Sequence, residues 1–206
     1  METNVSTVIV VTGASRGIGK AIALSLAAPD TALIINCSKS AGRLELVKEE
    51  IIKKGALCET FVGDVSNYST VNEMFDLAIS IYGKVNVLIN NAGIASIGLF
   101  QDMTPDMWNN IMSVNLNSVY NCCHFAVQDM LRRHCGKIIN ISSVWGLYGA
   151  SCEVAYSATK GAINSFTKAL AKELAPSNIQ VNAIACGAID TEMNGHLSPE
   201  ELQELA

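Results

Sequence analysis

Long apolar runs, basic clusters and paired cysteine motifs are all missing from this sequence of 206 residues. No apolar run approaches the roughly eighteen residues that would span a bilayer, and no basic stretch precedes the first such run. The 14 lysines and arginines are scattered and outnumbered by 19 acidic residues, which argues against nucleic acid or an anionic membrane as a partner. The seven cysteines form no CxxC pair, so we expect neither a disulfide framework nor a metal site. These features predict a cytoplasmic protein.

Short apolar segments alternate with segments of helical periodicity along the whole chain. The apolar segments are nearly continuous, as in strands covered on both faces. Strict alternation of strand and helix predicts an α/β fold: a Rossmann-type, doubly wound parallel sheet in three α/β/α layers, as a single domain over residues 1–206. Ligands bind such sheets beyond the carboxyl ends of the strands. The expected strands are 7–13, 31–37, 57–65, 85–93, 136–143 and 179–187, and the expected helices are 17–28, 42–55, 69–83, 104–134 and 153–175.

A glycine-rich turn, TGASRGIG, follows the first expected strand. Gly13 permits a tight turn, Gly17 lets the backbone approach a pyrophosphate, and Gly19 allows close helix packing. The start of the following helix offers free N–H groups to phosphates. A plain structural turn could contain the same glycines, but the position between a strand and a helix favours dinucleotide binding.

The end of the second strand indicates which dinucleotide is bound. A site for the free 2′-hydroxyl of NAD usually has an acidic residue there. Here Ser38 and Lys39 follow the strand, whereas Asp30 precedes it, at the opposite edge of the sheet. Together with Arg16 in the glycine turn, these residues would accept a 2′-phosphate, which predicts NADPH/NADP+ as the cofactor. The alternative is that Arg16 and Lys39 are only solvated charges.

The third and fourth strands end in residues that suit the wall of a nucleotide site. Asp64 could accept a hydrogen bond from an adenine amino group; alternatively, Asp64 or Ser66 could cap the next helix. The NNAG segment at 90–93 could form a rigid wall beside the cofactor, or simply a stable turn rich in asparagine.

A serine, a tyrosine and a lysine follow the fifth strand. Ser142 and Ser143 end the strand, and we interpret Ser142 as a residue that caps a turn. Tyr156 comes thirteen residues after Ser143, and Lys160 lies four residues further on. That last spacing places the phenol and the ammonium on one helix face, one turn apart. A tyrosine–lysine pair alone would usually be a surface coincidence, but in this setting it predicts a catalytic group.

These motifs, in this order, resemble those of the short-chain dehydrogenase/reductase family, and above all its 3-oxoacyl-acyl-carrier-protein reductases. The matching segments are TGASRGIG, NNAG, SVNLNSVYN, GKIINISSVWG, YSATK and KALAKELAPSNIQVNAIACGAIDTEM. The resemblance implies that Tyr156 is the general acid and that Lys160 both lowers the pKa of that phenol, normally about 10, and holds the nicotinamide ribose. It also implies that Ser143 binds the substrate carbonyl oxygen and that Asn115 holds a water in a proton relay. Alternatively, Asn115 is a polar residue whose hydrogen bonds are satisfied within the fold, which leaves the other three catalytic residues unaffected. The expected cofactor-binding residues are Gly13, Ser15, Arg16, Gly17, Ile18, Gly19, Ser38, Lys39, Asp64, Val65, Asn91, Ala92, Gly93, Tyr156, Lys160, Ile189 and Thr191.

Three features depart from the family pattern. Cys186 stands where the family usually has a proline, which adds a backbone N–H to that loop. Residues 1–206 are expected to lack the family's usual C-terminal strand. Ser177 occupies a place where reductases of carrier-protein substrates have a basic residue, which leaves Arg132 and Arg133 as candidate contacts for an acidic carrier. The family resemblance also implies a homotetramer.

The substrate remains open. The leading hypothesis is reduction of a 3-oxoacyl group on acyl carrier protein to the 3-hydroxyacyl product, in fatty acid synthesis. Alternatively, Glu153 could receive an amine, because GASCEVAYSA resembles reductases of a 5-aminopentanone-modified lysine on elongation factor P. Glu153 could equally be a first-turn acid that complements the helix dipole. Two further alternatives are that the substrate is another small ketone, or that the protein is a nucleotide-sensing scaffold without catalytic activity. The expected substrate contacts are Ser143, Glu153 and Tyr156.

Overall fold

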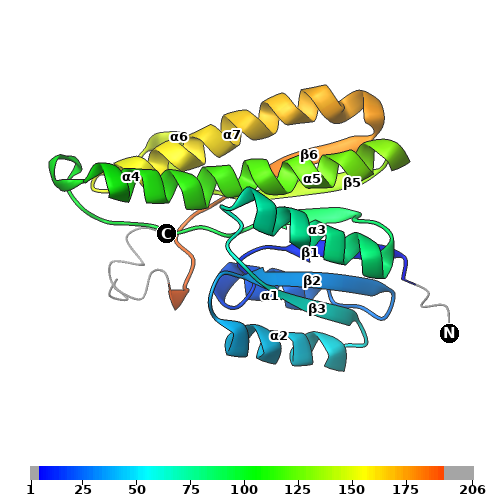
Figure 1. Ribbon diagram of the computed structural model, residues 1–206. Helices are drawn as coiled ribbons and strands as arrows, with labels where there is room; N and C mark the ends of the chain where they lie inside the picture. The colour runs from blue at the N-terminus through cyan, green and yellow to red at the C-terminus, as the bar shows by residue number, and fades with distance from the viewer. Residues whose placement is uncertain (1–4, 193–206) are drawn as a thin grey trace.

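Six parallel strands form the centre of the computed structural model, which describes residues 5–192 (Figure 1). The order β3-β2-β1-β4-β5-β6 confirms the predicted doubly wound sheet. The direction of strand succession reverses between β1 and β4, so the carboxyl ends of these strands border a crevice where a ligand can bind. The strands are β1 (Thr7–Val11), β2 (Thr31–Cys37), β3 (Leu57–Val62), β4 (Val87–Asn90), β5 (Gly136–Ser143) and β6 (Ile179–Cys186).

Helices cover both faces of the sheet, because the strands carry buried apolar side chains on both sides. All seven residues of β2 are buried. On one face, α1 (Gly17–Leu26) and α2 (Ala41–Lys53) pack against Leu33 and Ile35. On the other, α3 (Tyr68–Tyr82), α5 (Ser118–Arg133) and α7 (Val154–Leu174) enclose Val10, Leu88 and Ile138. Figure 1 shows α2 on the opposite side of the molecule from α5 and α7.

The start of α3 corrects one sequence prediction. Neither Asp64 nor Ser66 caps this helix; the cap is Asn67, whose side chain accepts hydrogen bonds from the backbone N–H groups of Ser69 and Thr70. The Asp64 carboxylate accepts instead from the backbone N–H of Ser66, at 2.9 Å. The sequence could not separate these residues, because aspartate, serine and asparagine are all good caps and the true cap lies three residues after Asp64.

The segment expected as one helix over 104–134 is interrupted in the structure. Thr104 caps α4 (Pro105–Met112), and a π-helical turn, η2 (Ser113–Asn117), separates it from α5. Such a wider turn re-aims side chains and is common at functional sites. Here it contains Asn115, which is fully buried. The remaining short elements are η1 (Phe100–Asp102), α6 (Trp145–Tyr148) and η3 (Ala175–Ser177).

Within residues 5–192, no helix combines the length and the apolar character needed to cross a membrane.

Candidate functional site

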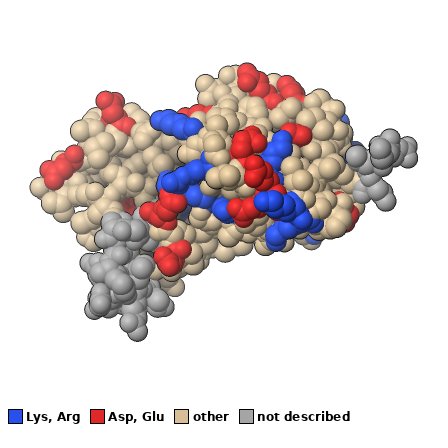
Figure 2. Space-filling model, turned by 90° about the horizontal axis from the view of Figure 1, so that it is seen from below, with Lys and Arg blue, Asp and Glu red and all other residues tan. Residues whose placement is uncertain are grey.

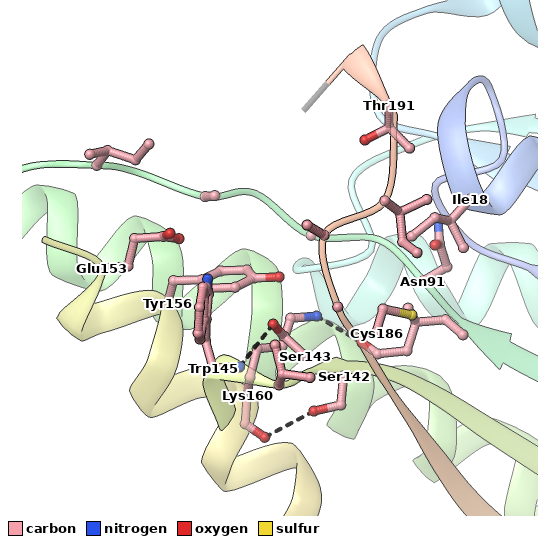
Figure 3. A pocket seen from close by; sticks show the side chains of 18 residues that line it. Ile18, Asn91, Ser142, Ser143, Trp145, Glu153, Tyr156, Lys160, Cys186 and Thr191 are labelled. Carbon is pink, nitrogen blue, oxygen red and sulfur yellow. Dashed lines mark hydrogen bonds between the residues drawn. The ribbon is translucent and has the colours of Figure 1, made fainter. Parts of the chain in front are cut away.

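One cavity opens where β4, β5 and β6 end, between the start of α1 and the first turns of α7 (Figure 3). Ser143, Tyr156 and Lys160, the three residues predicted to carry the chemistry, all line it. Ser143 ends β5, whereas Tyr156 and Lys160 lie one turn apart on α7. The sheet and the helix therefore bring together a hydroxyl, a phenol and an ammonium.

Lys160 is almost completely buried, with 5% of its surface exposed. Its Nζ donates a hydrogen bond to the carbonyl oxygen of Ile141 at 2.8 Å and lies 5.5 Å from the centre of the Tyr156 ring. Burial of the ammonium lowers the pKa of Lys160 from 10.5 to about 8. The lysine is therefore held as a buried cation whose charge is costly to keep.

The pKa of Tyr156 differs from the sequence prediction. We expected Lys160 to lower it, but burial of the phenol raises it above 10, and a hydrogen bond with Ser143 only partly opposes that rise. The negative charge of Glu153 raises the pKa further. The Lys160 ammonium donates its hydrogen bond to the Ile141 carbonyl, and the burial of the phenol decides the direction of the shift. Tyr156 is thus protonated at neutral pH and suited to donate a proton.

The turn contact expected of Ser142 is made by its neighbour Ser143. Ser142, interpreted as a turn cap, instead donates to the Lys160 carbonyl oxygen at 3.3 Å and so ties β5 to α7. Ser143 is the one that accepts a hydrogen bond from a turn, the backbone N–H of Trp145 at 3.2 Å. Figure 3 shows the Ser143 hydroxyl between Trp145 and the phenol of Tyr156.

Asn115 lies behind the cavity wall, and its side chain is fully engaged. Its Oδ1 accepts from the backbone N–H of Ile94 at 2.8 Å, and its Nδ2 donates to the Ile94 carbonyl and to Thr159 Oγ1, at 2.9 and 3.2 Å. Thr159 in turn donates to the Tyr156 carbonyl at 2.7 Å. Asn115 thereby connects the loop after β4 to the helical turn that carries Tyr156 and Lys160. Sequence reasoning missed Thr159, because a threonine inside a helix carries no signal of a partner 44 residues away.

The glycine turn fits a nicotinamide dinucleotide. Gly13 has φ +64, and a Cβ there would approach the Ala92 Cα to 2.9 Å. A Cβ on Gly19 would overlap Asn91 Nδ2 and the Gly13 carbonyl oxygen. At the start of α1, Arg16 is the cap residue and makes no side-chain cap, and no acidic residue stands in the first turn. The first N–H groups of this helix therefore remain available to phosphate oxygens.

Asn91 holds the glycine turn against β4. Its side chain donates to the carbonyl oxygens of Thr12 and Gly13 at 3.0 and 3.1 Å. The hydroxyl of Thr12 accepts from the backbone N–H groups of Asn91 and Ala92. These four hydrogen bonds join the two strand ends on either side of the crevice, in addition to the bond from the Thr12 backbone N–H to the Ile89 carbonyl.

The structure brings some predicted cofactor residues together and leaves others apart. Ser15, Arg16 and Gly17 line a second groove, between the glycine turn and α2. Ser38, Lys39 and Asp64 are exposed outside both hollows, and the Val65 side chain packs in the core. In addition to Tyr156 and Lys160, the predicted cofactor residues that line the main cavity are Ile18, Asn91, Gly93, Ile189 and Thr191.

Glu153 and Lys160 carry the charges among the described residues that line the main cavity. Figure 3 shows Glu153 at one side, next to Tyr156. Cys186 lies near Lys160; burial raises the pKa of its thiol, and the charge of Lys160 opposes this shift. Trp145 also lines the cavity. It was not predicted from the sequence, because a single aromatic residue after a strand is typical of a hydrophobic core.

Comparison with known proteins gives consistent similarities. The model of the family described as short chain dehydrogenase matches residues 7–202. A 3-oxoacyl-[acyl-carrier-protein] reductase from Synechocystis is 38% identical over 195 residues, which cover 95% of this chain and 79% of the relative. The reductase FabG of Staphylococcus aureus is 41% identical over 194 residues, 94% of this chain and 78% of the relative. A solved structure from Sinorhizobium meliloti, described as a candidate short-chain alcohol dehydrogenase, matches with a TM-score of 0.90 at 32% identity, covering 97% of this chain and 79% of that one.

Proposed function

The chain belongs to the short-chain dehydrogenase family, and from this premise we propose that it is an NADPH-dependent reductase of 3-oxoacyl groups on acyl carrier protein. As a family member it is an oxidoreductase that acts on a carbonyl or hydroxyl group with a nicotinamide cofactor. The observation that carries the proposal is the convergence of Ser143, Tyr156 and Lys160 on one cavity beside the glycine turn. A nucleotide-sensing scaffold without catalysis has no support from this arrangement.

The reaction needs a hydride at the carbonyl carbon and a proton at its oxygen. The cofactor, when bound, supplies the hydride. Tyr156 gives its phenolic proton to the carbonyl oxygen as the alkoxide forms, because burial keeps that proton in place at neutral pH. Ser143 donates a hydrogen bond to the same oxygen and stabilises its developing charge. The phenolate left on Tyr156 then regains a proton from solvent, which closes the cycle.

Lys160 acts electrostatically in this scheme. Its ammonium lies 5.5 Å from the Tyr156 ring, close enough to stabilise the phenolate once the proton has left. With its pKa at about 8, Lys160 keeps its charge at neutral pH and loses it in mildly alkaline solution. We therefore expect the reductase activity to fall as the pH rises through about 8, and a kcat that is constant to pH 10 would contradict this role.

The first test is NADPH oxidation with acetoacetyl-CoA as the surrogate substrate. We expect turnover by the unmodified protein and its loss in Tyr156→Phe, which keeps the ring and removes the proton. Absence of turnover at high enzyme and saturating NADPH would refute the 3-oxoacyl assignment. Comparing kcat/KM for NADPH and NADH tests the cofactor, because parity or a preference for NADH would contradict NADPH as the physiological reductant.

A second candidate substrate is a ketone that bears an amine, such as an aminopentanone on a protein lysine. It is favoured by the carboxylate of Glu153, which lines the cavity next to Tyr156. A negative charge there attracts an ammonium and repels an anionic substrate. Glu153→Gln should therefore raise the KM for an aminoketone and leave the KM for a neutral ketone of the same length unchanged. Equal effects on both ketones would remove the basis for this substrate.

We also propose that the protein forms a homotetramer in the cytoplasm and receives its substrate on a carrier protein. Apolar side chains remain exposed on α4 and α5, where Met107, Tyr120 and Leu131 are 41%, 51% and 38% exposed. Of the two arginines expected to meet the carrier, Arg133 is engaged by Asp129 and the Val85 carbonyl, so Arg132 is the better candidate. Light scattering after size exclusion tests the assembly, and a monomeric mass would refute it.

A further inference from the structure

The carboxylate of Glu192 lies between two guanidinium groups that come from different parts of the fold. Arg16 Nη1 is 2.8 Å from Glu192 Oε2, and Arg43 Nη1 is 2.9 and 3.1 Å from its two oxygens. Arg16 precedes α1 in the glycine turn, Arg43 lies in the first turn of α2, and Glu192 follows β6. The two arginines pull the pKa of Glu192 below its usual value. Three distant segments thus meet around one anion.

This meeting point lies where the adenosine end of a dinucleotide would bind. Arg16, Arg43 and Glu192 line the groove between the glycine turn and α2, next to the carboxyl end of β2. In a sheet of this kind the adenine ribose lies there, so its 2′ position faces the groove. The sequence predicted Lys39 as the second cation, but Lys39 does not line the groove and Arg43 does. Two guanidinium groups directed at one anion also suit a phosphate, which they can bind in a fork geometry.

Two neighbouring lysines have acidic partners of their own, so they do not combine with Arg16 and Arg43 into one large positive surface. Lys20 is paired with Glu50 at 2.9 Å, and Lys48 with Glu59 at 2.9 Å. Figure 2 shows positive and negative side chains interleaved over this face of the molecule. Arg16 and Arg43 instead share the single carboxylate of Glu192.

We propose that Glu192 is an intramolecular competitor of the cofactor's 2′-phosphate for Arg16 and Arg43. This inference rests on the proposed use of NADPH. A 2′-phosphate takes over the two guanidinium groups and releases Glu192. A cofactor without that phosphate leaves the ion pairs in place. Glu192 therefore narrows the difference in affinity between NADPH and NADH.

The release of Glu192 also affects the main cavity, through the neighbouring residue in the segment after β6. Thr191, the neighbouring residue, lies over the glycine turn, because a Cβ on Gly17 would be 3.7 Å from its Cγ2. Thr191 also lines the cavity that contains Tyr156 and Lys160. The ion pairs of Glu192 thus hold the segment after β6 against the glycine turn, and binding of the 2′-phosphate frees that segment to adjust to the rest of the cofactor.

The test uses two probes without a nicotinamide, so that it measures binding and no turnover. Calorimetric Kd values are compared for 2′,5′-ADP, which carries the 2′-phosphate, and for 5′-ADP, which lacks it. Each exposed ion pair contributes modestly, so Glu192→Gln should tighten 2′,5′-ADP by about two- to tenfold and leave 5′-ADP unchanged. Arg43→Gln should weaken 2′,5′-ADP by about tenfold, again without an effect on 5′-ADP.

Lys39→Gln tests the cation predicted from sequence against Arg43: because Lys39 lies outside the groove, its removal should change both Kd values by less than about twofold. The inference is overturned if Glu192→Gln or Arg43→Gln leaves the 2′,5′-ADP affinity unchanged, or if Lys39→Gln has the effect expected of Arg43→Gln. Should the wild type bind both probes equally while Glu192→Gln tightens only 2′,5′-ADP, the competitor stands and the proposed NADPH preference fails. If the wild type prefers 2′,5′-ADP and no variant alters this preference, the proposed NADPH preference stands and the role of Glu192 as a competitor is refuted.

Discussion

Replacing Lys160 by methionine should stabilise the protein at neutral pH while abolishing its activity. The lysine is 5% exposed and its pKa falls from 10.5 to about 8, so burying the charged form costs roughly 3 kcal/mol. Methionine has a similar length and no charge, and it removes this cost. It also loses the hydrogen bond to Ile141, which contributes about 1 kcal/mol. The expected gain is therefore about 2 kcal/mol below pH 8.

The sign of this difference depends on pH. Below pH 8 Lys160 is protonated in both the folded and unfolded chain, and the full cost is present. Between pH 8 and 10.5 the unfolded chain still holds the proton that the folded chain has released, so the stability of the wild type rises with pH. Near pH 10.5 the cost has disappeared and only the missing hydrogen bond distinguishes the two proteins. Lys160→Met should then be about 1 kcal/mol less stable than wild type.

Urea unfolding of both proteins at pH 6.5 and at pH 10 measures these differences. The comparison at each pH cancels the titration of groups that the two chains share. Lys168→Met, on the exposed side of the same helix, is the control and should change stability by less than about 0.5 kcal/mol at either pH. A Lys160→Met protein that is less stable than wild type at pH 6.5, or a difference that does not move with pH, would refute the argument.

Three further substitutions test how the site is held. Gly146→Ala places a Cβ 2.6 Å from the Lys160 carbonyl carbon, so unfolding free energy should fall by about 1–3 kcal/mol and kcat should fall with it; two unchanged values would argue against this packing. Thr159→Val removes the hydroxyl that binds Asn115, so the free energy of unfolding should fall by about 1–2 kcal/mol and kcat should fall as well. Thr159→Ser keeps the hydroxyl and should retain both values. Equal losses in the two variants would contradict a role for this hydrogen bond. Gly19→Ala crowds the glycine turn, and calorimetry should show weaker binding of 5′-ADP; unchanged affinity would show that the turn can relax.

The parts of the site that could be predicted from sequence are those encoded by local spacing. The turn with Gly13, Gly17 and Gly19 lies between a strand and a helix, and such a turn keeps its geometry wherever it occurs. Tyr156 and Lys160 share a helix face because they are four residues apart. Ser143 reaches the same cavity because parallel strands all end at one edge of the sheet.

Predictions that depended on where a side chain points were wrong in two places. Ser142 and Ser143 look equivalent in sequence, and the structure gave the turn contact to Ser143 and the α7 contact to Ser142. The shift in the Tyr156 pKa was expected in the wrong direction, because proximity of Lys160 along the helix does not reveal that its ammonium donates to the Ile141 carbonyl or that burial of the phenol decides the shift.

By itself, the sequence determined the alternation of strands and helices, the glycine turn and the face that carries Tyr156 and Lys160, because each depends on residues close together in the chain. Only the tertiary structure decided that Asn115 contacts Thr159 and that Arg16 and Arg43 share Glu192, a residue 176 positions from Arg16. These contacts depend on how the strands are ordered and where the chain crosses the sheet. Hydrogen bonds and ion pairs act over a few ångströms, so only the folded chain brings such partners within reach.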